Sequence, residues 1–306
     1  MNQKSMTALI SAFSRAYHSE NNEVKIFYDT VARRLISDEE YARISTAMAQ
    51  GIAFFNPSLK GSDNEALRFV VDSQLSPSPL GRAAFAEKSL ETAAAIGASQ
   101  YLILGAGYDT FAYRQPEWAK NLRIFELDLP ATANDKIERL KRAEIEMPEN
   151  VHFVSTDFTC ENPLDSLTSS ADFDSGKISF CSILGVSYYL PEPDFQKLIC
   201  NISAVLSDGS SIIFDYPDED NYTEKAGDRA KKQAMLAGGA NEKMLAKYSY
   251  KDIEKLLSDA GLLVYEHLTP EQMTDQYFYS YNEANPSHKM AAFDNVNYCL
   301  AVKKKI

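Results

Sequence analysis

The sequence lacks the features of membrane, secreted and nucleic-acid-binding proteins. No apolar run approaches the 18 or so residues that a membrane-spanning helix needs, and the amino-terminal MNQKSMTALISAF lacks the apolar core of a signal peptide. Lys and Arg number 31 against 43 Asp and Glu, and the net charge of −12 disfavours binding to nucleic-acid phosphates. We therefore expect a cytoplasmic protein with neither a nucleic acid nor a membrane as partner.

Metal ligands and nucleophile motifs are also scarce. The four histidines form neither HExxH nor another tight metal spacing, so no metal is expected. The segment GVSYY misses the second glycine of GxSxG, which disfavours a serine hydrolase. Three of the four cysteines fall in or beside predicted strands or helices, and the lack of CxxC spacing suits buried thiols better than disulfides or zinc; the four are Cys160, Cys181, Cys200 and Cys299.

The most informative stretch is YLILGAGYDTFAYR, residues 101–114. Its apolar start, Tyr101 to Leu104, predicts a buried strand, and Gly105-Ala106-Gly107 predicts a sharp turn against which a ligand can lie. A second strand, Arg123 to Leu127, is followed by Asp128 about 20 residues past the glycines, the spacing of an acid that binds a ribose. The stretch favours a nucleotide site, and a purely structural turn with a capping acid is the alternative.

The glycine pattern also limits which nucleotide is bound. A dinucleotide fingerprint needs a third glycine where Thr110 stands, so an NAD-dependent dehydrogenase is disfavoured. The sequence has no GxxxxGK[ST] motif to hold a triphosphate. S-adenosylmethionine, which carries a ribose and an adenine but no phosphate, fits this pattern.

LGAGYDTFAYR followed by FELDLP resembles the leucine carboxyl methyltransferase family, which includes polyketide carboxylate O-methyltransferases. That family has LGAG-x-DT-x-x-x-R and then FE-x-D-x-P at similar spacing. The likeness extends to Asp157-Phe158 and to Tyr189-Leu190-Pro191, and it covers roughly residues 10–215. The resemblance implies S-adenosyl-L-methionine as cofactor, with S-adenosyl-L-homocysteine as its product.

The resemblance also implies roles for individual residues. Arg82 would bind the methionyl carboxylate of the cofactor, for which a guanidinium fork is suited; a surface arginine is the alternative. Asp128 rather than Glu126 would bind the ribose, and Asp157 with Phe158 would hold the adenine unless Asp157 merely caps its loop. The expected cofactor-binding set is Arg82, Gly105, Ala106, Gly107, Asp109, Thr110, Asp128, Leu129, Asp157 and Phe158.

One position departs from the family pattern. Many relatives have a glutamate a few residues before the YLP, where this sequence has Leu184. No acid occurs in SILGVSYYLP, so a contact made by that glutamate elsewhere is missing or supplied differently.

The whole chain predicts one α/β domain with a Rossmann-like, seven-stranded, mostly parallel sheet and an antiparallel last strand. An amino-terminal helical cap is expected at 1–80, with helices from Val24 to Leu35, Asp38 to about Ala53 and Asp63 to Leu75. Prolines and a glycine at 76–81 predict its end, before a helix that Arg82 opens. The remaining parts are a core at 81–216, a lid insertion at 217–248, and a carboxyl-terminal part at 249–306 with a second insertion at 269–295.

The insertions and the cap are expected to cover the carboxyl ends of the strands. Their tyrosines are candidates for an apolar substrate pocket, and packing onto the outer helices is the alternative. The candidate pocket residues are Tyr222 and Tyr277 of the insertions, together with Tyr188 and Tyr189 of the core.

These observations together predict an O-methyltransferase that forms a methyl ester on a small-molecule carboxylate. A carboxylate is ionised near neutral pH and needs no base, whereas a phenol has a reference pKa of about 10 and does. No base is evident, and no catalytic residue is assigned. Methylation of a protein carboxyl terminus and a catalytically inactive cofactor-binding protein remain alternatives, and the sequence determines neither the acceptor nor the oligomeric state.

Overall fold

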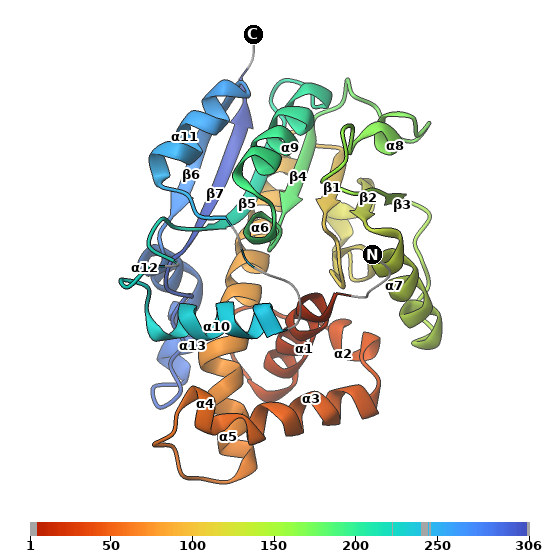
Figure 1. Ribbon diagram of the computed structural model, residues 1–306. Helices are drawn as coiled ribbons and strands as arrows, with labels where there is room; N and C mark the ends of the chain where they lie inside the picture. The colour runs from red at the N-terminus through yellow and green to blue at the C-terminus, as the bar shows by residue number, and fades with distance from the viewer. Residues whose placement is uncertain (1–4, 222, 240–243, 245, 305–306) are drawn as a thin grey trace.

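The structure is a computed structural model that describes residues 5–221, 223–239, 244 and 246–304 (Figure 1). Its seven strands form one sheet in the order β3-β2-β1-β4-β5-β7-β6. Strands β1 to β5 are parallel, and β7 runs antiparallel to both β5 and β6, as predicted. The strands are β1 (Gln100–Leu104), β2 (Arg123–Asp128), β3 (Val151–Ser155), β4 (Ser179–Ile183), β5 (Ser211–Pro217), β6 (Leu262–Leu268) and β7 (Val296–Lys303).

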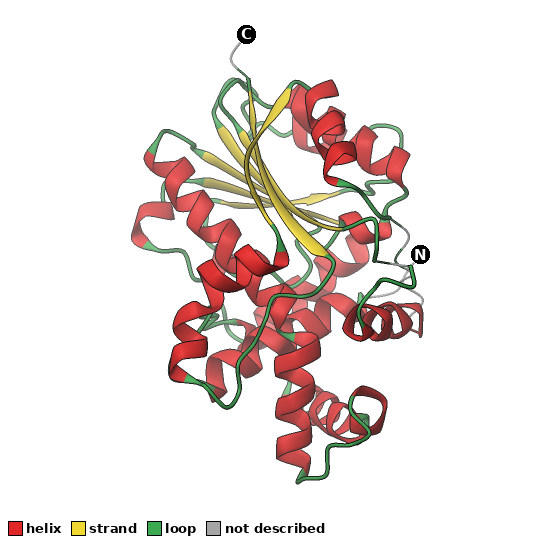
Figure 2. Cartoon of the chain, turned by 90° about the vertical axis from the view of Figure 1, so that its left-hand side faces the viewer, coloured by secondary structure: helices red, strands yellow, loops and turns green. Residues whose placement is uncertain are grey.

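Helices cover both faces of this sheet (Figure 2). Along β1, Tyr101 and Ile103 pack with α6 (Pro77–Ala95), whereas Leu102 and Leu104 pack with α9 (Glu192–Val205) and α11 (Tyr250–Asp259) on the other face. Because both faces of β1 are buried, the strand reads as an uninterrupted apolar run. Two further helices pack beside β3, α7 (Pro130–Arg142) and the short α8 (Asp165–Thr168).

The topology places a crevice at the carboxyl ends of β1 and β4. Strand β1 lies between β2 and β4, so the chain leaves the middle of the sheet in opposite directions, which is where open α/β sheets bind ligands. The turns after the two strands touch: a Cβ added to Gly105 would lie 2.5 Å from Val186 Cγ2.

The amino-terminal helices lie beneath this edge of the sheet (Figure 1). They are α1 (Met6–Asn21), α2 (Ala32–Leu35), α3 (Asp38–Gln50), α4 (Ile52–Phe55) and α5 (Asp63–Val70), which continues as a π-helix over Val71–Leu75. The predictions near 38–53 and 63–75 are confirmed.

The predicted helix from Val24 to Leu35 is wrong, because only α2 of that stretch is helical. Val24 and Tyr28, which suggested an apolar stripe, are exposed. Helix α1 carries the buried stripe instead, on the residues Leu9, Ala12, Phe13 and Ala16.

Helix α6 begins five residues earlier than expected, at Pro77 rather than Arg82. Pro77 and Pro79 lie in its first turn, where a backbone N–H has no intrahelical acceptor and proline costs little. Arg82 therefore lies in the second turn, close to the carboxyl edge of the sheet.

The two insertions are more ordered than a pair of loops. The first contains α10 (Asp228–Gly239), which crosses below the sheet (Figure 1). The second forms α12 (Pro270–Met273), a π-helix (Thr274–Phe278) and α13 (Tyr279–Ala284). Its Phe278 and Tyr281 are fully buried, and Phe278 packs against Gly81 of α6. Among the described residues, no helix has both the length and the apolarity to cross a membrane.

Candidate functional site

The turn after β1 strongly favours glycine at two positions. Gly105 has φ +67° and Gly107 has φ +48°, the left-handed region in which a side chain is strained. The backbone N–H groups of Gly105 and Ala106 both donate to Leu127 O of β2, at 2.8 and 3.2 Å. The turn is thereby fixed against the next strand, with its backbone bare of large side chains.

Asp128 holds the same turn from the end of β2. Its Oδ2 accepts the Gly107 N–H at 2.6 Å, and its Oδ1 accepts the N–H of the exposed Leu129 at 2.7 Å. Burial raises the pKa of Asp128, although both backbone bonds act in the opposite direction. Each carboxylate oxygen has a second lone pair, so Asp128 can still accept hydrogen bonds from hydroxyl groups of a ligand.

Glu126, two residues earlier, is only 1% exposed. Its Oε2 accepts from Lys136 Nζ at 2.6 Å and from the Tyr113 hydroxyl at 3.2 Å. The two acids therefore have different environments, an internal ion pair for Glu126 and the rim of the glycine turn for Asp128.

Arg82 reaches the turn after β4. Its Nη1 lies 3.4 Å from Asp215 Oδ2, and its Nη2 donates to Ser11 Oγ at 3.2 Å. A Cβ added to Gly185 would lie only 2.3 Å from Nη1, so the guanidinium rests against that glycine. Burial disfavours the charged form, but Asp215 and three neighbouring tyrosines together favour it and raise the pKa of Arg82; the tyrosines are Tyr188, Tyr189 and Tyr298. Interpreting Arg82 as a surface arginine is therefore wrong.

Asp215, at the end of β5, was not expected from the sequence. It is fully buried; its Oδ1 accepts the Gly185 N–H at 2.7 Å and its Oδ2 accepts the Tyr188 hydroxyl at 2.8 Å. An acid thus reaches the turn after β4 from β5, not from the position that Leu184 occupies.

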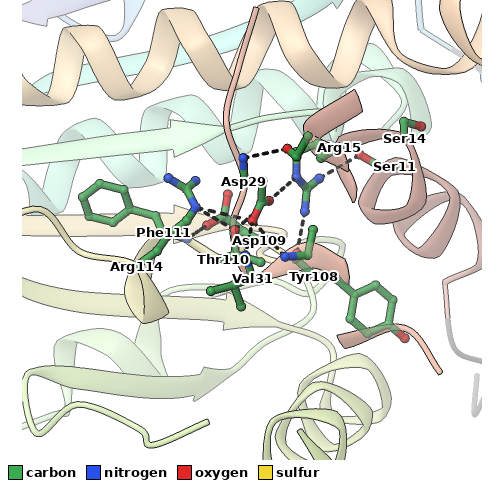
Figure 3. Close-up of polar contacts among 12 residues, drawn as sticks. Ser11, Ser14, Arg15, Asp29, Val31, Tyr108, Asp109, Thr110, Phe111 and Arg114 are labelled. Atoms are coloured by element: carbon green, nitrogen blue, oxygen red, sulfur yellow. Dashed lines mark hydrogen bonds and ion pairs between the residues drawn. The ribbon is translucent and has the colours of Figure 1, made fainter. Parts of the chain in front are cut away.

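A second buried acid, Asp29, joins the glycine turn to the cap (Figure 3). Its Oδ2 accepts from Arg15 Nε at 2.9 Å and from the Thr110 hydroxyl at 2.8 Å. Arg15 Nη2 also donates to Tyr108 O at 2.6 Å. The Thr110 hydroxyl therefore binds the cap, whereas Asp109 accepts the Phe111 N–H at 2.8 Å and orders the backbone that follows the glycines.

Helix α1 lies directly on the glycine turn. A Cβ at Gly107 would be 3.2 Å from Ala8 Cβ. Ser11 Oγ accepts from Arg15 Nη1 and from Arg82 Nη2, both at 3.2 Å, so one hydroxyl connects the two arginines. The apolar periodicity of α1 could have revealed the helix, but nothing in the sequence indicates its contact with residues about a hundred positions away.

Asp157 and Phe158 follow β3, on the same side of the glycine turn as β2. Phe158 is half-buried, and its Cε2 lies 4.0 Å from where a Gly105 Cβ would be. Asp157 is exposed, and its Oδ1 accepts the N–H and hydroxyl of Thr159 at 2.9 and 2.6 Å, which lowers the Asp157 pKa. Asp157 does cap its own loop, and its Oδ2 remains available for the predicted contact with adenine.

The candidate pocket tyrosines do not form one group. Tyr188 is buried beneath the site, with Tyr189 beside it at 6.3 Å between ring centroids. Tyr277 packs on α6, against Phe85 at 5.9 Å and Lys88 at 5.4 Å, as in the alternative in which the tyrosines cover outer helices. Tyr222 lies outside the described residues. No cluster of possible metal ligands occurs in the described part of the chain.

Comparison with known proteins agrees with this geometry. The family model of leucine carboxyl methyltransferase matches residues 8–203. The protein of Bacillus subtilis (strain 168) named "Putative S-adenosyl-L-methionine-dependent methyltransferase YktD" is 42% identical over 99% of both chains. A protein of Mycobacterium ulcerans named "Putative S-adenosyl-L-methionine-dependent methyltransferase" is 30% identical over 60% of this chain and 58% of its own.

Two solved structures share the fold. The "putative methyltransferase" from Thermobifida fusca YX has a TM-score of 0.55 at 13% identity, covering 100% of this chain and 97% of its own. A DUF574 family protein from Streptomyces avermitilis has a TM-score of 0.59 at 12% identity, covering 99% and 98%. The match over 8–203 takes in α1, the glycine turn, Asp128 and the turn after β4, and this chain belongs to the leucine carboxyl methyltransferase family.

Proposed function

We propose that this chain forms methyl esters on a carboxylate of a small organic acid. Its family makes it an S-adenosyl-L-methionine-dependent methyltransferase, and the acceptor is the subject of the proposal. The observation that supports it most is that Asp215 and Tyr188, at the carboxyl ends of β4 and β5, are already paired with Gly185, Arg82 and each other, which suits an acceptor that is ionised without a base.

The residues at this edge fit the cofactor. Asp128 would bind the ribose hydroxyls through its free lone pairs, with Gly105 and Gly107 allowing the ligand to approach the backbone. Leu129 and Phe158 offer apolar surface for the adenine, with Asp157 as acceptor for its amine. Arg82 would bind the carboxylate of the methionyl group. When bound, S-adenosyl-L-methionine supplies a methyl group on a positively charged sulfur.

The protein side chains supply position rather than proton transfer. Asp215 already accepts from Gly185 and Tyr188 and pairs with Arg82, so it is poorly placed to take a proton from an acceptor. Burial raises the pKa of Tyr188, which keeps this hydroxyl protonated. A carboxylate acceptor needs no base because it is ionised at neutral pH. The chain's contribution would then be to align the acceptor oxygen with the methyl group and to exclude water.

Methyl transfer from labelled S-adenosyl-L-methionine to a cell extract tests the proposal. We expect the label in the small-molecule fraction, in a product that releases labelled methanol on mild alkaline treatment, as an ester does. Alkali-stable label would indicate an ether and contradict the carboxylate. Alkali-labile label in the protein fraction would instead support the methylation of a protein carboxyl terminus.

A further inference from the structure

Another partly buried arginine lies at the same edge of the sheet. Arg229 is in the first turn of α10, the helix that crosses below the strands. Its Nη2 donates to Ala291 O at 3.1 Å, and its guanidinium carbon lies 4.7 Å from the centre of the Phe293 ring. These two residues directly precede the antiparallel β7, whose first residue Val296 pairs with Pro217, the last residue of β5. Arg229 therefore lies where the parallel strands end.

The charge of Arg229 is poorly balanced. Its Nη1 is 3.7 Å from Oδ1 of Asp294, whose side chain is 47% exposed, so this ion pair is long and partly solvated. Its Nε is buried and has no hydrogen-bond partner among the described residues. Burial accordingly lowers the pKa of Arg229, since Asp294 only partly compensates for it. A buried N–H donor without an acceptor is costly, and an anionic ligand would satisfy it.

Tyr298 of β7 is a second unsatisfied donor nearby. It pairs with Asp215 in the antiparallel register, so the two side chains project from the same face of the sheet. Tyr298 is 1% exposed, yet its hydroxyl has no partner among the residues that the structure describes. Burial and the charge of Asp215 raise the pKa of Tyr298, whereas Arg82 and Arg229 act in the opposite direction. Because Asp215 pairs with Arg82, Tyr298 lies on the face of the sheet that Arg82 reaches.

The two arginines have different surroundings. Arg82 forms an ion pair with Asp215 and donates a further hydrogen bond to Ser11. Arg229 faces an aromatic ring, a backbone carbonyl and a distant carboxylate, and it keeps one donor free. A single cofactor has one carboxylate, which Arg82 would take. The second cation is then left for the acceptor.

We propose that Arg229 and Tyr298 bind the carboxylate of the methyl acceptor and thereby select organic acids as substrates. This inference rests on the proposed function. One carboxylate oxygen would accept hydrogen bonds from Arg229 Nε and the Tyr298 hydroxyl, while the other attacks the methyl carbon. The new O–CH₃ bond forms as the S–CH₃ bond breaks, the bonding pair returns to sulfur, and no proton moves. The ester is neutral, so its attraction to Arg229 falls and the product can leave.

The test is binding of defined probes to the complex of the whole chain with S-adenosyl-L-homocysteine. Benzoate and octanoate, each compared with its uncharged amide, are titrated into the wild-type protein and into Arg229→Gln, Arg229→Lys and Tyr298→Phe. Lys231→Gln is the matched control, because this exposed lysine on the same helix contacts only Glu224 O among the described residues. We expect at least one carboxylate to bind wild type about tenfold more tightly than its amide.

Arg229→Gln should remove that preference, Arg229→Lys should retain part of it, and Lys231→Gln should leave it unchanged. Affinity for S-adenosyl-L-homocysteine should stay constant in all variants, which shows that they are folded. Equal binding of carboxylates and amides by wild type, or an unchanged preference in Arg229→Gln, would overturn the inference. If wild type nevertheless forms an alkali-labile methylated product in the extract assay, the proposed function stands and only the assignment of Arg229 fails.

Discussion

At the residue scale, the strand pattern of β2 could not distinguish the roles of its two acids, Glu126 and Asp128. Alternation along β2 places both acids on one face, so the sequence separated them only by resemblance. Their environments differ because Lys136 reaches Glu126, whereas the Gly107 N–H reaches Asp128. Residue types and spacing predicted the glycine turn, but not Asp215 or Asp29, whose partners come from other elements.

Asp128→Asn should weaken binding of S-adenosyl-L-homocysteine by about 1–3 kcal/mol, because ribose hydroxyls lose a charged acceptor. Glu126→Gln should instead lower the free energy of unfolding by about 3–5 kcal/mol, since Lys136 stays buried without its counter-charge. Calorimetric titration and denaturant unfolding measure the two effects. The assignment fails if Glu126→Gln weakens the ligand more than Asp128→Asn does.

Gly107→Ala should cost about 1–2 kcal/mol in the free energy of unfolding, because φ is +48° and the new Cβ would press on Ala8. Gly238→Ala is the matched control, since a Cβ there meets nothing within 4 Å and alanine favours a helix by about 0.5–1 kcal/mol. Urea unfolding of the two variants should therefore give shifts of opposite sign. A Gly107→Ala protein as stable as wild type would contradict the described turn.

At the scale of elements, α1 is the part of the cap that the sequence missed and the site depends on. Its Arg15 contacts Tyr108, 93 positions away, and Asp29 contacts Thr110 across 81 positions. Local periodicity carries no information about such contacts. The same limit explains why nothing in the sequence indicated the helices of the second insertion, which the buried Phe278 and Tyr281 hold in place.

The docking of α1 should depend on pH through His18, which is fully buried and accepts the Ile26 N–H at 2.9 Å. Burial, with Lys25 and Arg68, lowers the pKa of His18 from 6.5 to about 4. As the pH falls below 6.5, His18 therefore becomes protonated in the unfolded chain. In the folded chain it stays neutral until the pH reaches about 4. Stability should fall over this window by up to about 3 kcal/mol, while the group contributes nothing above pH 6.5.

His18→Gln, which keeps an acceptor for Ile26, should remove that part of the acid sensitivity. Denaturant unfolding at pH 7 and pH 4.5 measures the difference, and His288→Gln at an exposed position serves as the control. If wild type and His18→Gln lose the same stability between these pH values, His18 is not held neutral by the fold.

For the whole molecule, the mostly parallel seven-stranded sheet followed from the sequence, because each parallel strand is a short apolar run with helices between. The sequence did not predict the contacts through which segments cover the carboxyl ends of the strands. Four separate segments meet there: α1, α6, the turn after β4 and α10. Their contacts are tertiary, and they place Arg82 and Arg229 at one edge although 147 positions separate them along the chain.

A crystal structure of the chain with bound S-adenosyl-L-homocysteine tests the central claim most directly. The account predicts the ribose hydroxyls within hydrogen-bond distance of Asp128, the homocysteine carboxylate on Arg82, and the sulfur facing Arg229 and Tyr298. A ligand whose ribose binds elsewhere, or whose sulfur faces away from α10, would contradict it.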